Sequence, residues 1–181
     1  MTYTIIDLSN VKKYRRNDLD FLLMKFAKLV QGLVIDMKNF IRTEINENSI
    51  IVYFDCECQA DTRKVMGFNV LLNTYKAMFE NKNKISIDIA SDLINVSENY
   101  KFIPLDKLIQ CDNSIQCLVE CLNTQRDSSM YVGECMKENL DIKQYKMDDY
   151  KTLYGKLGIN YQVYECNYTL TGLNEKVKKI C

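Results

Sequence analysis

The stretch NDLDFLLMKFAKLVQGLVIDMKNFIRT, residues 17–43, is a long periodic segment of the chain and sets the fold prediction. Its apolar side chains recur at steps of three and four residues, the spacing of one face of an α-helix. Asn17 is suited to cap the first turn, and Asp18 and Asp20 place negative charge where the helix dipole favours it. We therefore predict an amphipathic helix over roughly 17–43, with Gly32 as the point where it would break.

Segments outside this helix show both periodicities. Runs that are dense in β-branched and aromatic residues, or that alternate apolar with polar residues, predict strands at 2–8, 49–54, 85–89 and 159–170. Helical spacing predicts further helices at 61–79, after Pro104, at 131–140 and at 147–157. We predict a helix-dominated α+β fold with a few short strands. An all-α fold is the alternative, if the isoleucine-rich runs are buried helices.

Length and composition favour one folded unit. The chain has 181 residues, of which 47% are hydrophobic, and it contains one proline and six glycines. Few proline- or glycine-rich linkers are available to separate domains, so we predict a single compact domain over 1–181. Division into two lobes near residues 100–104 is the alternative.

The start of the chain lacks the features of an export signal, and charged residues interrupt the most apolar segment, 19–37. We expect neither a signal peptide nor a membrane span. Eight cysteines in such a chain indicate reduced thiols, so we predict a cytoplasmic location.

The absence of histidine excludes most familiar catalytic constellations. With no imidazole in the sequence, the chain cannot use Ser-His-Asp or Cys-His catalysis or a histidine metal ligand. The glycines do not form a dinucleotide-binding or phosphate-loop motif. We predict a protein that is not an enzyme and needs no cofactor.

The cysteines do not have the spacing of a typical zinc site. Cys56 and Cys58 are separated by one residue, and Cys117 and Cys121 would lie one turn apart on a helix. Structural zinc sites usually have two to four residues between paired cysteines. Cys58 precedes a predicted helix, which would favour its thiolate, but acidic neighbours oppose ionisation. We predict no metal site and no catalytic cysteine.

A basic cluster lies directly before the long predicted helix. Four cations and one aromatic ring follow each other, as Lys12, Lys13, Tyr14, Arg15 and Arg16. Cations neutralise a phosphate backbone and an aromatic ring stacks on a base, so this cluster is a candidate site for nucleic acid or another anion. The alternative is a solvated loop whose charge is offset by the acidic residues that follow it.

Half of the twelve tyrosines occur in the last quarter of the chain. Tyrosine is enriched at protein interfaces because its ring is large, rigid and amphipathic. We predict a partner surface formed by Tyr150, Tyr154, Tyr161, Tyr164 and Tyr168. A buried core with polar edges is the alternative.

These observations predict a non-enzymatic intracellular interaction or regulatory protein. It would bind a protein partner or associate with itself through the long helix and the tyrosine-rich region. The abundance of Lys, Asn, Ile and Tyr is typical of AT-rich genomes, which suggests a virus-encoded factor that modulates a host. The alternative is a sequence-indifferent RNA-binding protein that uses residues 12–16, although the formal net charge is zero. No membrane partner is expected.

Overall fold

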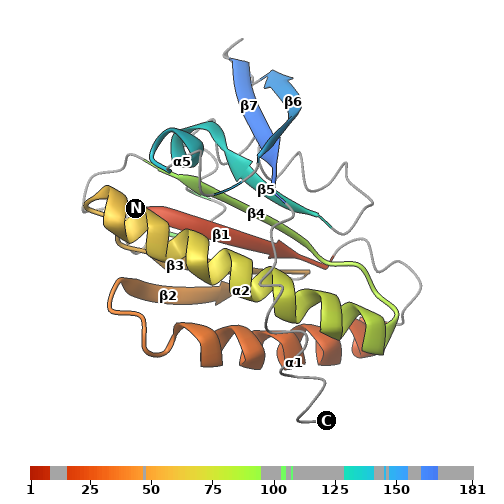
Figure 1. The fold of residues 1–181 in the computed structure, drawn as a ribbon. Helices are drawn as coiled ribbons and strands as arrows, with labels where there is room; N and C mark the ends of the chain where they lie inside the picture. The colour runs from red at the N-terminus through yellow and green to blue at the C-terminus, as the bar shows by residue number, and fades with distance from the viewer. Residues whose placement is uncertain are drawn as a thin grey trace, which may run out of the picture.

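A computed structural model describes residues 1–8, 16–46, 48–94, 103–104, 107, 129–140, 145, 147–154 and 160–166. Within these residues the fold is built on a seven-stranded sheet with the strand order β2-β3-β1-β4-β5-β7-β6 (Figure 1). The strands are β1 (Thr2–Asp7), β2 (Phe40–Ile45), β3 (Ser49–Phe54), β4 (Asp88–Leu93), β5 (Met130–Gly133), β6 (Asp148–Tyr154) and β7 (Asn160–Glu165). The pairing of β4 with β5 is parallel, and the other neighbouring pairs are antiparallel.

Two long helices, α1 (Arg16–Val34) and α2 (Gln59–Asn83), lie side by side on one side of the sheet (Figure 1). A short helix, α5 (Glu134–Glu138), directly follows β5. Alternate residues of the central strands, such as Ile6, Val52 and Ile89, belong to one buried apolar cluster with residues of α1 and α2. Each fully buried side chain of this kind contributes about 1.5–3 kcal/mol to folding.

A closed ring of three hydrogen bonds joins α2 to the sheet. Thr4 Oγ1 donates to Asn69 Oδ1, Asn69 Nδ2 donates to Ser91 Oγ, and Ser91 Oγ donates to Thr4 Oγ1, each at 2.9 Å. All three side chains are buried, and each finds a donor and an acceptor within the ring. Buried polar groups that are paired in this way avoid the cost of desolvation.

The helix predicted over 17–43 is shorter in the structure, because α1 ends at Val34 and residues 40–45 form β2. The segment from Phe40 to Ile45 contains β-branched and aromatic residues, and β3 offers it an antiparallel partner. The apolar spacing of residues 40–45 is compatible with a helix or a strand, and pairing with β3 decides in favour of the strand. The helix-dominated α+β class and its all-α alternative are wrong, because the fold is organised by its mixed sheet.

Other predictions agree with the structure to different degrees. The strands predicted at 2–8 and 49–54 and the helix predicted at 61–79 correspond to β1, β3 and α2. The strand predicted at 159–170 corresponds to β7 over 160–165, with residues 167–170 outside the described part of the chain. The strand predicted at 85–89 begins only at Asp88 and continues to Leu93 as β4. The helix predicted at 147–157 is wrong, because residues 148–154 form β6 paired with β7. The helix predicted at 131–140 begins only at Glu134, since Met130–Gly133 is β5.

The remaining organisational predictions fall largely on residues that the structure does not describe. The helices predicted after Pro104 lie almost entirely outside the described residues, and the single domain and its alternative boundary near 100–104 stay predictions. Among the described residues, no helix has the length and apolar character needed to cross a bilayer.

Candidate functional site

The face of the sheet opposite α1 and α2 carries acidic and phenolic side chains. Along β1, Tyr3 and Asp7 alternate with the residues that contact the helices, so they point to this opposite face. Asp88 and Asp92 of β4 lie directly across from Asp7 and Tyr3 in the strand register. The two central strands therefore present three carboxylates and a phenol on one face.

Asp7 and Asp88 form a cross-strand pair at the ends of β1 and β4. The exposed fractions are 6% for Asp7 and 0% for Asp88. The backbone N–H of Ser129 donates to Asp88 Oδ1 at 3.1 Å, and the hydroxyl of Ser129 donates to Glu165 Oε1 at 2.8 Å. Two carboxylates next to each other in a buried place favour a bound cation.

Lys76 of α2 is a buried cation that interacts electrostatically with Asp88. Its side chain is only 2% exposed, and its Nζ has no hydrogen-bond partner within the described part of the chain. Burial lowers the pKa of Lys76, and the charges of Glu80 and Asp88 act in the opposite direction. The ammonium group therefore lies in the electrostatic field of Asp88 without a direct ion pair in the structure.

Asp92 connects β4, β7 and α5 on the same face. Its Oδ2 accepts a very short hydrogen bond from Tyr161 Oη, and its Oδ1 accepts from the backbone N–H of Met136 at 2.7 Å. Burial, followed by the charge of Asp92, raises the pKa of Tyr161 well above its usual value. A Cβ atom at Gly133 would overlap the Tyr161 hydroxyl and the Asp92 carboxylate, so only glycine fits beside them.

A third polar group lies on β2 and β3. Arg42 forms an ion pair with Glu44 at 3.0 Å, and the Tyr53 hydroxyl donates to the same Glu44 oxygen at 3.1 Å. The guanidinium carbon of Arg42 lies 4.0 Å from the centre of the Tyr53 ring. Burial and the charge of Glu44 raise the pKa of Tyr53. This group is internally satisfied, which is typical of a structural network.

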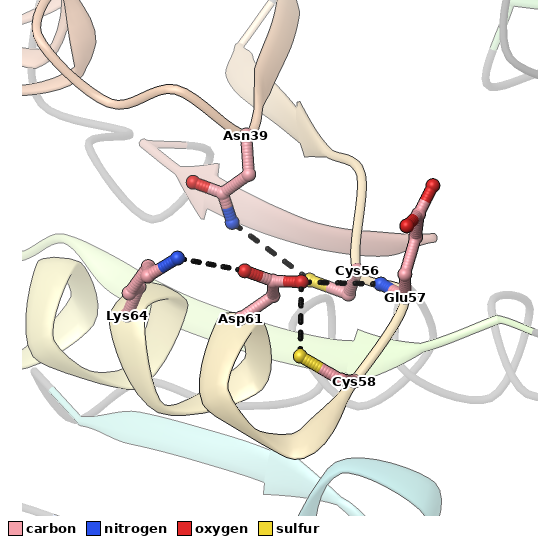
Figure 2. Close-up of polar contacts among 6 residues, drawn as sticks. All are labelled: Asn39, Cys56, Glu57, Cys58, Asp61 and Lys64. Atoms are coloured by element: carbon pink, nitrogen blue, oxygen red, sulfur yellow. Dashed lines mark hydrogen bonds and ion pairs between the residues drawn. The ribbon is translucent and has the colours of Figure 1, made fainter.

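The Cys56 and Cys58 thiols lie where β3 leads into α2 (Figure 2). The Cys58 thiol donates to Asp61 Oδ2 at 3.3 Å, and Lys64 donates to the other oxygen of Asp61 at 2.8 Å. Lys64 and then Cys58 lower the pKa of Asp61, whereas burial raises the pKa of the Cys56 thiol. Activation of a thiol as a nucleophile needs a neighbouring cation or a helix N-terminus, and the side-chain partner of Cys58 here is a carboxylate.

Metal-ligating side chains do not gather in this part of the fold. Within the described ranges, no group of three or more His, Cys, Asp or Glu side chains is placed to hold a metal ion. Cys117 and Cys121, the other two thiols considered for zinc, lie outside those ranges.

The residues predicted as a basic site lie mostly outside the described part of the chain. This applies to Lys12, Lys13, Tyr14 and Arg15, whereas Arg16 is the first residue of α1. Whether they bind an anion stays a prediction.

The predicted tyrosine surface is divided between several places. Tyr150 and Tyr154 belong to the backbone of β6, and Tyr168 lies outside the described residues. Tyr161 is buried against Asp92, while Tyr164 is half-buried with the Lys137 Nζ 3.3 Å from its ring centre. The structure does not bring these rings together as one described surface, and their role in binding stays a prediction.

Sequence reasoning missed the carboxylates of the opposite face. Asp7 ends a β-prone run, and Asp88 is one of the polar residues that alternate with isoleucine over residues 85–89. The available signal was an acidic residue inside or at the end of a predicted buried strand, because Asp and Glu are almost never fully buried unless they are paired. Their pairing depends on strand register, which the sequence does not show.

Comparison with known proteins finds relatives in fold alone. No family model matches the sequence, and no curated protein matches it. The adenylyl cyclase CyaB from P. aeruginosa is similar, with a TM-score of 0.66 and 8% identity over 91% of this chain and 92% of that one. The guanylate cyclase domain of RhGC from Catenaria anguillulae in complex with GTP has a TM-score of 0.64 and 11% identity, covering 93% and 96%. The dimeric guanylyl cyclase domain of the RhoGC fusion protein from Blastocladiella emersonii has a TM-score of 0.61 and 11% identity, covering 91% and 94%.

This likeness corrects the functional predictions. The chain shares its fold with catalytic domains over more than nine-tenths of its length, so the prediction that it is not an enzyme is wrong. The predicted interaction protein, the virus-encoded host-modulating factor and the RNA-binding alternative are overturned by the same finding. The prediction that the chain is not an enzyme rested on missing histidine and glycine-rich motifs, which exclude particular catalytic architectures but not this fold.

Proposed function

We propose that this chain is a nucleotide-cyclase-like enzyme that converts a nucleoside triphosphate into a cyclic monophosphate and pyrophosphate. In this reaction the 3′-oxygen of the ribose forms a bond to the α-phosphorus, and the bond from that phosphorus to the pyrophosphate oxygen breaks. The proton of the 3′-hydroxyl passes to solvent or to a carboxylate. Catalysis of such a transfer depends mainly on positioning and charge neutralisation, which need neither histidine nor a phosphate loop.

The observation that carries the proposal is the Asp7–Asp88 pair on a fold that covers cyclase domains almost completely. Hard divalent cations such as Mg²⁺ take oxygen ligands and are commonly bound by one or two carboxylates together with substrate phosphates. The donor set of Asp7 and Asp88 fits this chemistry, so these two residues would hold the cation. When bound, it would neutralise phosphate charge and polarise the reacting phosphoryl group.

Other residues of the face keep this pair in place. Ser129 holds one oxygen of Asp88 and also contacts Glu165, so the carboxylate is oriented by groups from two further parts of the sheet. Lys76 of α2 also interacts electrostatically with Asp88, from the helix side of the sheet. A preorganised pair of this kind needs little rearrangement when substrate arrives.

The test is a direct product assay with the full chain. Purified protein is incubated with ATP or GTP and either Mg²⁺ or Mn²⁺, and cyclic nucleotide and pyrophosphate are measured by mass spectrometry. We expect cyclic product with at least one nucleotide. We expect Asp7→Asn to lower the rate at least about 100-fold, because the amide cannot supply the charge that holds the cation.

Asp20→Asn is the matched control, since it removes the same charge from an exposed position on α1 and is expected to keep full activity. Thermal shift with Mn²⁺ and a non-hydrolysable nucleotide gives a second readout, in which wild type is stabilised and Asp7→Asn is not. Absence of both product and stabilisation in the wild-type protein would contradict the proposal. Undiminished activity of Asp7→Asn would remove the role of the carboxylate pair.

A homodimer is the proposed working unit. One solved structure of the similar domain from Blastocladiella emersonii is a non-canonical dimer and another is monomeric, and the dimeric form supports self-association of this chain. Size-exclusion chromatography with light scattering, with and without nucleotide, measures the assembly. A protein that is strictly monomeric while it turns over substrate would refute this part of the proposal.

A further inference from the structure

A groove between α1 and α2 lies on the outer side of the helix layer, away from the carboxylate pair. It has a volume of about 230 Å³ and is lined by Lys25, Leu29, Tyr75, Met78, Phe79, Lys82 and Asn83. At the base of the groove, Phe79 packs edge to face on the buried Phe26, with 4.9 Å between the ring centres. The groove therefore follows two long helices that are fixed against each other.

Exposed apolar side chains occur on the same two helices. Phe21 and Met24 of α1 have exposed fractions of 67% and 51%, and Met78 of α2, which lines the groove, is also exposed. Exposed apolar area at a concave surface, here Met78 at the groove, with Phe21 and Met24 elsewhere on α1, is typical of a binding site. The combination suits the insertion of apolar side chains from another molecule.

The charge of the groove defines its partner. Lys25 and Lys82 stand on opposite helices, and none of the residues that line the groove is acidic. A second copy of this chain, docked groove to groove, would place these lysines against each other, which is unfavourable. A flat anionic membrane would not fill a concave groove, and clusters that bind such membranes usually have more cations.

We propose that this groove docks an acidic, amphipathic helix of a partner protein. Apolar side chains of that helix enter between Leu29 and Met78, while its carboxylates meet Lys25 and Lys82 on the two sides. A helix that lays its apolar face into a groove is a recurring mode of recognition, and flanking charges set its orientation. This inference does not depend on the proposed enzymatic function, because the groove and the carboxylate pair lie on different sides of the sheet.

The test uses two fluorescein-labelled, hydrocarbon-stapled peptides of about 16 residues. Both carry leucines along one face, flanked by glutamates in the first peptide and by lysines in the second. Fluorescence polarisation with the full chain measures their affinities. We expect the acidic helix to bind at least about tenfold more tightly than the basic one, and Lys25→Glu with Lys82→Glu to reverse that order.

Lys38→Glu with Arg63→Glu is the control, because both residues are exposed and neither lines the groove. It should leave the order of affinities unchanged, and urea unfolding should show that both double variants are folded. The proposal fails if neither peptide binds below about 1 mM, if both bind equally, or if the groove variant keeps the wild-type preference. Binding to phosphatidylserine vesicles without any preference between the peptides would assign the surface to a membrane instead.

Discussion

The face of the sheet beneath α1 and α2 buries apolar side chains, whereas the opposite face buries carboxylates and phenols. Beneath the helices, Ile6 and Ile89 belong to one apolar cluster, and the polar ring around Asn69 is fully paired. On the other face, Asp88 and Asp92 are completely buried and accept hydrogen bonds from several elements. Apolar burial stabilises the fold directly, whereas buried charge must be compensated. The first face therefore stabilises the molecule, whereas the second buries charged groups at an energetic cost.

The largest expected effect on stability comes from a substitution in the apolar core beneath the helices. Phe26→Ala removes a fully buried ring that packs on Phe79, so we expect the free energy of unfolding to fall by about 3–5 kcal/mol. Urea denaturation measures the change. Phe21→Ala on the same helix is the control, because Phe21 is mostly exposed and should change stability by no more than about 0.5 kcal/mol. Similar losses for both variants would show that α1 is not anchored through Phe26.

The second prediction perturbs the polar face by adding one methyl group. Gly133→Ala places a Cβ into the Tyr161 hydroxyl and the Asp92 carboxylate, and we expect a loss of about 1–3 kcal/mol in unfolding free energy. Adding Tyr161→Phe should restore part of that loss, because it removes one of the two overlapping groups.

Gly67 provides a matched comparison within the chain. A Cβ at this exposed position of α2 meets nothing within 4 Å, so Gly67→Ala should stabilise the protein by about 0.5–1 kcal/mol. If Gly133→Ala were also stabilising, the close contact between Tyr161 and Asp92 would not exist in solution.

The third prediction concerns Lys76, whose pKa is lowered by burial. The unfolded chain then binds the proton more tightly than the folded chain, so stability rises as the pH increases from the folded-state pKa towards the unfolded value of 10.5. Lys76→Met should be more stable than wild type near neutral pH by on the order of 1 kcal/mol. This difference should shrink as the pH approaches 10.5.

Urea denaturation of both proteins between neutral and alkaline pH tests this, and the difference between them cancels titrations that they share. A difference that is constant with pH would mean that the lysine is not desolvated in solution. A large loss of stability in Lys76→Met would instead show that its attraction to Asp88 and Glu80 outweighs the cost of burying it.

The smallest expected effect is at the connection between β3 and α2 (Figure 2). Cys58 is the N-cap of α2, and its sulfur makes no capping hydrogen bond. Cys58→Ser supplies an oxygen that can accept from the first turn, so we expect a gain of about 0.5–1 kcal/mol in thermal or urea unfolding. Cys135→Ser, at another exposed thiol, should be nearly neutral. A clear loss at Cys58 would point to a role for its contact with Asp61.

Local sequence was sufficient for the elements whose pattern fits one conformation only. β3 is a short run of β-branched and aromatic residues, and the helical spacing over residues 61–79 falls within α2. Residues 40–45 and 148–154 have spacings that satisfy both periods, and they form strands because β3 and β7 pair with them. Whether such a segment forms a helix or a strand therefore depends on its tertiary contacts and not on its own sequence alone.

The candidate site could not be predicted from local sequence either, because it also depends on long-range strand pairing. Asp7 and Asp88 meet only because β1 and β4 are adjacent in a particular register, and Asp92 meets Tyr161 across two strand pairings. No short motif joins these positions. The missing histidines removed only one kind of active site, and the carboxylates that could replace it were spread over the whole chain.

The ring formed by Thr4, Asn69 and Ser91 has an evolutionary consequence. Each member gives one proton and receives another, so changing any one of them leaves two neighbours with unmet bonding capacity inside the protein. In related sequences these three positions should covary: all three should be polar, or all three should be replaced by apolar residues.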